Sequence, residues 1–200
     1  MDSDDTELYR DITELAHDTP PWVQHLAEAW TEAGLLLFGV LFAVAWWRAR
    51  RDTSRAFAIA VLAPVATALA YVCSEVLKSA VGEERPCRAV AGAVSPLVAC
   101  PPTGDWSFPS NHATIAGAAA VALALTRRVL LAVTAPLALL MAFSRVFVGV
   151  HYPHDVAAGL LLGALVAVVA IRLGTRPAAR LTEAMRGSSR PTATWFAGRP

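Results

Sequence analysis

Residues 56–77 read AFAIAVLAPVATALAYVCSEVL, and Glu75 is the one charged side chain in this stretch. A helix that crosses a hydrocarbon core of about 30 Å needs roughly 20 mostly apolar residues. The stretch therefore predicts a membrane-spanning helix. The whole chain fits a membrane protein, because 56% of its 200 residues are hydrophobic and its mean hydropathy is +0.47, whereas soluble domains usually have about 45–50% apolar residues.

Four further apolar stretches extend this prediction to a helical bundle. They cover residues 27–47, 112–125 with their flanks, 129–150 and 155–172. The third span in chain order is short unless it begins near Ser107, and the fourth contains Ser144 and Arg145. We predict an all-α, polytopic transmembrane bundle of about five spans, with the spanning domain over residues 27–172.

The two ends of the chain differ from this domain. Within residues 1–26, Leu8, Ile12 and Leu15 recur at helical spacing among acidic side chains, which predicts an amphipathic helix that lies at the interface or caps the bundle. A solvated tail is the alternative. Residues 173–200 are rich in Arg, Thr, Ser, Pro and Gly, and this composition predicts a disordered, cytoplasmic tail.

The basic residues orient the predicted bundle, because cytoplasmic loops retain Lys and Arg. With the amino terminus outside, five spans place most arginines and the carboxyl terminus on the cytoplasmic side. The cations left at the outer side are Arg10, Lys78, Arg85, Arg88 and Arg145. The arginines form separate clusters rather than a contiguous basic face, which argues against nucleic-acid binding.

Three groups of polar residues fall at the outer ends of the predicted spans. Lys78, the only lysine, precedes Arg85-Pro86 by seven residues; a snorkelling anchor is the structural alternative. Ser110, Asn111 and His112 open the third span, where unpaired amides and the helix dipole stabilise an anion; a capping serine is the alternative there.

The third group joins the fourth span to the fifth. It runs from Ser144-Arg145 to His151 and Asp155. Since His151 and Asp155 are four residues apart, the carboxylate can hold the ring nitrogen that does not react. A salt bridge is the structural alternative for Arg145.

Together the three groups favour phosphoryl transfer. Cations and a helix amino terminus stabilise charge on the nonbridging oxygens, one neutral imidazole attacks phosphorus, and a second imidazole protonates the leaving oxygen. A metal-dependent route is disfavoured, because the predicted site has no carboxylate-rich cluster and its cations repel a divalent ion. We predict no metal and no cofactor.

The three groups resemble the signature of the type 2 phosphatidic acid phosphatase superfamily, KxxxxxxRP, PSGH and SRxxxxxHxxxD, in order and spacing. The resemblance implies that His151 is the nucleophile, Asp155 orients it and His112 is the general acid. It also implies phosphate binding by Lys78, Arg85, Ser110, Asn111 and Arg145, and metal independence.

Two features depart from that family. Asn111 replaces the usual glycine of the second block, and it adds a side chain where the backbone approaches phosphate. Asn tolerates unusual backbone angles better than most residues, so we expect activity to survive. The chain also has five predicted spans where many bacterial members have six.

Cys87 and Cys100 lie in the outer loop, whereas Cys73 lies in the second span. An oxidising exterior favours a disulfide between Cys87 and Cys100, and two free thiols are the alternative. The loop, residues 81–108, is expected either to form a lid over the site or to be a plain connector.

The resemblance implies a multi-pass enzyme of the cell membrane that removes phosphate from a lipid at the extracytoplasmic face. Undecaprenyl diphosphate is the first candidate substrate, with phosphatidylglycerophosphate and phosphatidic acid as alternatives. The expected partners are this phosphorylated lipid and membrane lipids, and no oligomeric state is predicted. A vanadate haloperoxidase shares the oxyanion cradle but is expected to be soluble. A non-catalytic anion-binding membrane protein is disfavoured by the complete His112, His151 and Asp155 set.

Overall fold

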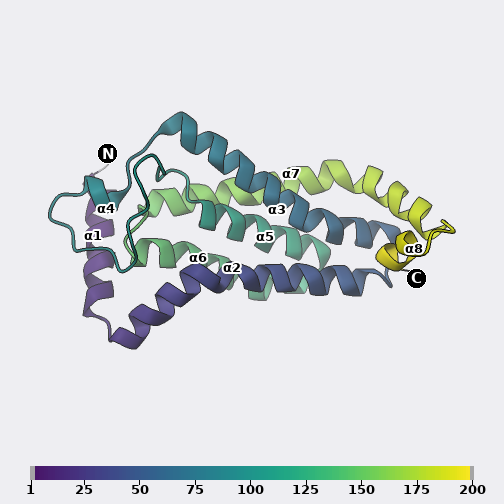
Figure 1. Cartoon of the computed structure of the whole chain (residues 1–200), viewed down its shortest axis with the longest axis horizontal. Helices are drawn as coiled ribbons and strands as arrows, with labels where there is room; N and C mark the ends of the chain where they lie inside the picture. The colour runs from purple at the N-terminus through teal and green to yellow at the C-terminus, as the bar shows by residue number, and fades with distance from the viewer. Residues whose placement is uncertain (1–2, 199–200) are drawn as a thin grey trace.

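A computed structural model describes residues 3–198 as a set of helices without strands (Figure 1). The helices in chain order are α1 (Ser3–Asp18), α2 (Pro21–Ala49), α3 (Ser54–Val81), α4 (Pro86–Ala89), α5 (Asn111–Thr126), the 3-10 turn η1 (Arg128–Leu130), α6 (Leu131–Phe147), α7 (Pro153–Arg186) and α8 (Pro191–Ala197). The predicted all-α bundle is confirmed.

Four helical stretches in the described residues are long and apolar enough to cross a membrane, namely α2, α3, α6 together with η1, and α7. Their outward side chains are apolar, as at Leu36, Val65, Leu69 and Leu161. The fifth apolar helix, α5, has 16 residues and is therefore about 24 Å long. It is short because it is a central helix, in contact with α2, α3, α6 and α7.

Small residues let α5 and α7 approach closely. Half of α5 is buried alanine, threonine and glycine. A Cβ atom added at Gly159 of α7 would lie 2.6 Å from the backbone oxygen of Ser110, and one at Gly163 would overlap the backbone oxygen of Thr114. Because small residues permit close helix contact inside a membrane, this pair fixes the start of α7 against the start of α5.

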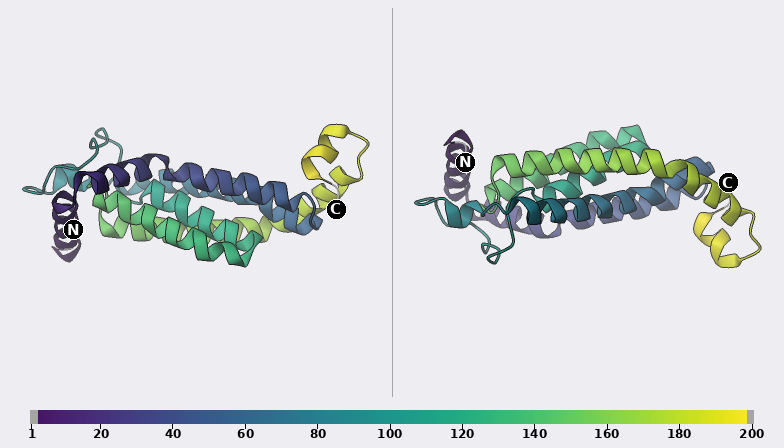
Figure 2. Two further views of the ribbon diagram at one scale, coloured as in Figure 1. Left: turned by 90° about the horizontal axis from the view of Figure 1, so that it is seen from below. Right: turned by 90° about the horizontal axis from the view of Figure 1, so that it is seen from above.

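The amphipathic helix α1 lies across one end of the bundle (Figures 1 and 2). Its buried face consists of Tyr9, Thr13 and Ala16, whereas Leu8 and Leu15 are about half exposed. The predicted helix is therefore present, but the face that it buries lies next to the face that the sequence predicted. Tyr9 explains the difference, because its hydroxyl donates to the Gly149 carbonyl at 3.0 Å.

The prediction that residues 173–200 are disordered is wrong for the described part of that segment. Helix α7 continues to Arg186, and α8 folds back on the bundle. The Phe196 ring lies 5.7 Å from those of Trp46 and Phe57, and Arg186 donates to the Asp52 carbonyl at 2.8 Å. Composition alone missed these aromatic contacts. Residues 199–200 lie outside the described part.

The segment between α3 and α5 covers the same end of the bundle as α1 (Figure 1). It contains α4, and Cys87 and Cys100 form a disulfide within it. Helix α1 holds the segment, because Arg10 donates to the Ala91 carbonyl at 2.9 Å and the His17 ring contacts the Ser95 carbonyl at 2.7 Å. We call residues 82–110 the cap loop.

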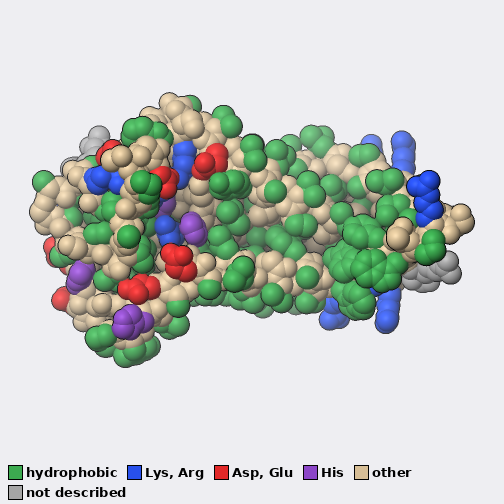
Figure 3. Space-filling view, viewed as in Figure 1, with side chains coloured by type: hydrophobic (Ala, Val, Ile, Leu, Met, Phe, Trp, Pro, Cys, Tyr) green, Lys and Arg blue, Asp and Glu red, His purple; other side chains and the backbone are tan. Residues whose placement is uncertain are grey.

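Charged side chains gather at the two ends of the molecule on the face shown in Figure 3. Acidic, basic and histidine side chains mix at the end that carries α1 and the cap loop, while basic side chains mark the other end. Hydrophobic side chains cover much of the length between them. This distribution is typical of a helical bundle that spans a bilayer.

Candidate active site

A cavity of about 360 Å³ opens at the α1 end of the bundle. Lys78 comes from the last turn of α3, His112 from the first turn of α5 and Arg145 from the last turn of α6. The residues that line the cavity are Tyr71, Lys78, Arg85, Pro101, Asp105, Asn111, His112, Ile115, Arg145 and His151. Six of the eight predicted catalytic and phosphate-binding residues therefore share one cavity, and Ser110 and Asp155 lie behind it.

His151 lies between α6 and α7 and is 1% exposed. Its Nδ1 is 3.2 Å from Asp155 Oδ2, and its Nε2 is 3.1 Å from Arg85 Nη1. A guanidinium can only donate, so Nε2 accepts and the proton sits on Nδ1, toward Asp155. In this tautomer the lone pair of Nε2 accepts from Arg85.

The environment keeps His151 neutral. Burial lowers its pKa well below the usual 6.5, and the positive charges of Arg85, Arg145 and Lys78 lower it further. A neutral imidazole is the nucleophilic form.

Asp155 is fully buried at the start of α7. Its Oδ2 accepts from the Tyr152 amide at 2.8 Å and from the Ser107 hydroxyl. Ser107 Oγ is also 3.4 Å from His151 Nδ1. Sequence reasoning gave Ser107 no role, because nothing in its local pattern separates it from an ordinary loop serine, although it stands only three residues before Ser110.

Arg145 is 6% exposed, and one of its nitrogens donates to Thr31 Oγ1 of α2 at 2.6 Å. Its Nε is buried and has no hydrogen-bond partner. A buried, unpaired donor costs free energy unless a ligand satisfies it. Arg145, which lines the cavity, therefore has an unused donor.

Lys78 and Arg85 are also buried, at 5% and 3% exposure. Both contact the Asp105 carboxylate of the cap loop, with Lys78 Nζ at 3.1 Å and Arg85 Nη2 at 2.9 Å from Oδ1. Burial tends to raise the pKa of Asp105, but the hydrogen bond and charge of Arg85, together with Lys78, hold that pKa below its usual value. The carboxylate is therefore ionised.

The second sequence block is arranged as a helix start. Ser110 Oγ accepts from the Ala113 amide, so Ser110 caps α5 and does not line the cavity; its role as a phosphate ligand stays a prediction. Asn111 Oδ1 accepts from Ser74 at 2.7 Å, and its Nδ2 donates to Glu75. Positive φ angles occur only at glycines in the described residues, so Asn111 needs no unusual backbone angle.

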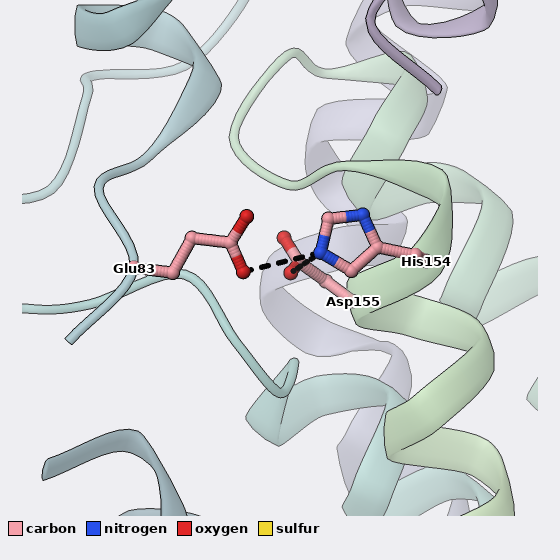
Figure 4. A group of neighbouring side chains, drawn as sticks. All are labelled: Glu83, His154 and Asp155. Atoms are coloured by element: carbon pink, nitrogen blue, oxygen red, sulfur yellow. Dashed lines mark hydrogen bonds and ion pairs between the residues drawn. The ribbon is translucent and has the colours of Figure 1, made fainter. Parts of the chain in front are cut away.

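His154 forms a charged group behind the cavity (Figure 4). Its Nδ1 is 2.7 Å from Asp5 Oδ2, and its Nε2 is 3.1 Å from Glu83 Oε2 and 3.3 Å from Asp155 Oδ1. Glu83, His154 and Asp155 have the donor types that bind a metal. However, carboxylates face both ring nitrogens, and this arrangement equally fits an imidazolium that donates from each.

These features define a polytopic membrane protein with a cationic cavity beside a histidine–aspartate pair. The family model of the PAP2 superfamily matches residues 59–177. The chain therefore belongs to the PAP2 superfamily, and the resemblance drawn from the three sequence blocks is confirmed.

Similar proteins support the same family. The chain is 35% identical over 120 residues to an undecaprenyl-diphosphatase from Sulfolobus acidocaldarius, covering 59% of this chain and 57% of that protein. It is 35% identical over 141 residues to the decaprenylphosphoryl-5-phosphoribose phosphatase of Mycobacterium tuberculosis, covering 70% and 72%. The crystal structure of a PAP2-type phosphatidylglycerolphosphate phosphatase from Bacillus subtilis matches with a TM-score of 0.64 at 22% identity, over 88% of each chain.

Proposed function

We propose that this chain is a membrane phosphatase that hydrolyses a polyprenyl-linked phosphate or diphosphate through a phosphohistidine on His151. The observation that carries the proposal is the buried His151, which lines the cavity while Asp155 holds its Nδ1 and Arg85 contacts its Nε2. Lys78, Arg85 and Arg145 supply the positive charge that phosphoryl transfer requires.

In the first step, His151 Nε2 attacks phosphorus and the bond to the leaving oxygen breaks. The phosphate oxygens replace Nε2 as acceptors for Arg85, and the buried Nε of Arg145 gains a partner. His112 gives a proton to the leaving oxygen, which departs on the lipid. Asp155 stabilises the positive charge that develops on the His151 ring, as a buried carboxylate does beside a catalytic imidazole.

In the second step, water attacks the phosphorus of the phosphohistidine. His112 takes the proton of that water, the bond between phosphorus and Nε2 breaks, and inorganic phosphate is released. The same imidazole thus acts first as an acid and then as a base. No step uses a metal ion.

Undecaprenyl diphosphate is the first candidate substrate, because a relative at 35% identity carries that activity in its name. Decaprenylphosphoryl-5-phosphoribose is the second, because the mycobacterial relative covers more of this chain. Both are phosphate esters of molecules that carry a long isoprenoid chain. The likeness to the Bacillus enzyme supports the fold alone, so phosphatidylglycerophosphate and phosphatidic acid serve as comparison substrates.

The proposed site faces the outside of the cell. Arginines such as Arg55, Arg128, Arg172 and Arg176 surround a second cavity near the opposite ends of α3, α5 and α7, and the positive-inside rule places such an end in the cytoplasm. The disulfide in the cap loop supports the same orientation, because disulfides persist in oxidising compartments.

The test is phosphate release by the purified protein in detergent, with the two polyprenyl substrates and the two phospholipids side by side. We expect His151→Ala to lower release at least about 1,000-fold, while His25→Ala, which changes an exposed histidine of α2, has no effect. Acid-labile phosphate should accumulate on the unaltered protein during turnover. Release that survives in His151→Ala rejects the mechanism, and strong inhibition by EDTA points to a metal instead.

A further inference from the structure

A carboxylate already occupies the cation pair of the cavity. Asp105 Oδ1 bridges Lys78 Nζ and Arg85 Nη2 at 3.1 and 2.9 Å. Among the described residues that line the cavity, Asp105 is the one acidic side chain. An anionic oxygen that accepts from both a lysine and an arginine has the same partners as a nonbridging oxygen of a phosphate.

This contact is not needed to hold the cap loop in place. The Asp105 carbonyl accepts from Arg85 Nε at 2.8 Å, and its amide donates to Pro102 at 3.1 Å. Two residues later, the Ser107 amide donates to the Glu83 carbonyl at 2.7 Å. The backbone is therefore fixed on both sides of Asp105, and the carboxylate can leave the cations by rotation of its own side chain.

Solvent is within reach of the Asp105 carboxylate when it leaves the two cations. The side chain of Asp105 is 43% exposed, while those of Lys78 and Arg85 are 6% and 3% exposed. Rotation toward solvent returns the carboxylate to water and leaves the two cations buried. Two buried cations without an anion repel each other and lose solvation, so the empty site favours the position of Asp105 that is observed.

We propose that Asp105 is a tethered anion that competes with phosphate for Lys78 and Arg85, and so lowers the affinity of the site for inorganic phosphate, the product of the reaction. The proposal rests on the proposed function of this cavity. Every phosphate must displace the carboxylate, so Asp105 lowers the affinity of the site for each of them. Weaker binding of inorganic phosphate reduces inhibition by the product.

The test compares Asp105→Asn with Glu84→Gln in titrations of the purified proteins with inorganic phosphate. Glu84 is the matched control, because it lies in the same cap loop but pairs with Arg88. We expect Asp105→Asn to bind phosphate about tenfold more tightly or better, as expected for removing a like charge within a few ångströms, and Glu84→Gln to change affinity less than about twofold. In turnover, Asp105→Asn should show a correspondingly lower inhibition constant for phosphate.

The alternative is that Asp105 holds Lys78 and Arg85 in the positions that bind phosphate. In that case Asp105→Asn binds phosphate equally well or more weakly, and the proposal is overturned. If Asp105→Asn does not fold, the proposal can still be tested on the unaltered protein. Carbodiimide labelling of Asp105 should rise when phosphate saturates the site, because the carboxylate is released to solvent. No rise, or a fall, also overturns it.

These readouts are separate from the proposed function. Binding of phosphate and labelling of Asp105 need no catalysis. If the unaltered protein hydrolyses none of the four lipids but Asp105→Asn tightens phosphate binding, the competitor role stands and the proposed function fails. If hydrolysis occurs and phosphate binding is unchanged, only the role of Asp105 fails.

Discussion

At the scale of single residues, the arrangement around His151 depends on two neighbours with opposite properties. Arg85 can only donate and Asp155 can only accept, so together they fix which ring nitrogen carries the proton. Ser107 donates to the same carboxylate oxygen and so helps to hold the carboxylate in place. The ring of His151, the proposed nucleophile, is thus oriented before any substrate arrives.

Replacing Asp155 with asparagine should separate catalysis from binding. The amide can present its NH2 group to Nδ1, which favours the opposite tautomer and puts the proton on Nε2. We expect kcat to fall by about 100-fold or more, while inorganic phosphate still binds, because Lys78, Arg85 and Arg145 are unchanged. Steady-state kinetics and phosphate titration measure the two effects. Equal losses of binding and turnover would assign Asp155 a structural role only.

The pKa of His151 leads to a prediction about pH. The reactive form is the deprotonated imidazole, and burial together with Arg85, Arg145 and Lys78 lowers the pKa well below 6.5. A lowered pKa keeps the imidazole reactive as the pH falls. We therefore expect the acidic limb of kcat/KM to lie below pH 6.5. The prediction is contradicted if the acidic limb is centred at pH 6.5 and stays there in His25→Ala. His151 would then titrate like an exposed histidine.

The sequence predicted the residues that are unusual for their surroundings. A lysine, arginines and histidines at the ends of apolar spans stand out, and the structure brings Lys78, Arg85, Arg145, His112 and His151 to one cavity. Asp105, Ser107 and Thr31 were not predicted as site residues. Acidic and hydroxyl side chains are ordinary in loops and at helix ends, so only the tertiary contacts distinguish these three.

At the scale of helices, the position of the site depends on how closely α5 and α7 approach. Helix α5 carries His112 and α7 begins beside His151, and Gly159 and Gly163 are where α7 meets the α5 backbone. The Ser110 amide donates to the Asp155 carbonyl at 3.1 Å just above this contact. A change in the spacing of the two helices therefore moves His112, the proposed acid, relative to His151, the proposed nucleophile.

One methyl group should be enough to show this dependence. Gly163→Ala forces the added carbon against the backbone of Thr114, and such overpacking typically costs about 1–3 kcal/mol. Gly39→Ala in α2 is the control, because a carbon added there meets nothing within 4 Å. We expect a lower Tm and lower activity for the first variant only, measured by thermal unfolding and phosphate release in detergent. Equal Tm values for the two variants would contradict the close contact.

Hydropathy predicted the elements that face lipid better than those that face water. The cores of α2, α3, α6 and α7 follow from their apolar runs. The end of α7 and helix α8 could not be predicted in this way, because Arg, Thr, Ser, Pro and Gly are frequent there. Their packing depends on a few side chains such as Trp195 and Phe196. In α1 the helical period was predicted correctly, but the buried face was set by the Tyr9 contact with Gly149.

At the scale of the whole molecule, the two charged ends have different compositions. The end with the cavity carries acidic residues and histidines around buried cations, whereas the far end carries arginines (Figure 3). Since a bilayer potential and the insertion machinery act on such asymmetry, the proposed orientation is open to a direct measurement.

Single cysteines can report that orientation in intact cells. With Cys73 replaced by alanine, Glu14→Cys in α1 should react with a membrane-impermeant thiol reagent, and Ser189→Cys after α7 should react only after the cells are opened. Both positions are exposed. The disulfide between Cys87 and Cys100 leaves no other free thiol. The reverse pattern would place the site in the cytoplasm.

The charged group around His154 has a consequence for biosynthesis. Asp5 comes from the first helix, Glu83 follows the third, and His154 and Asp155 begin the last long one. A chain still leaving the ribosome therefore lacks the partners that complete this group until its final long segment has been inserted. In the proposed mechanism a half-made chain is therefore inactive, because His151 and Asp155 are supplied near the end of synthesis.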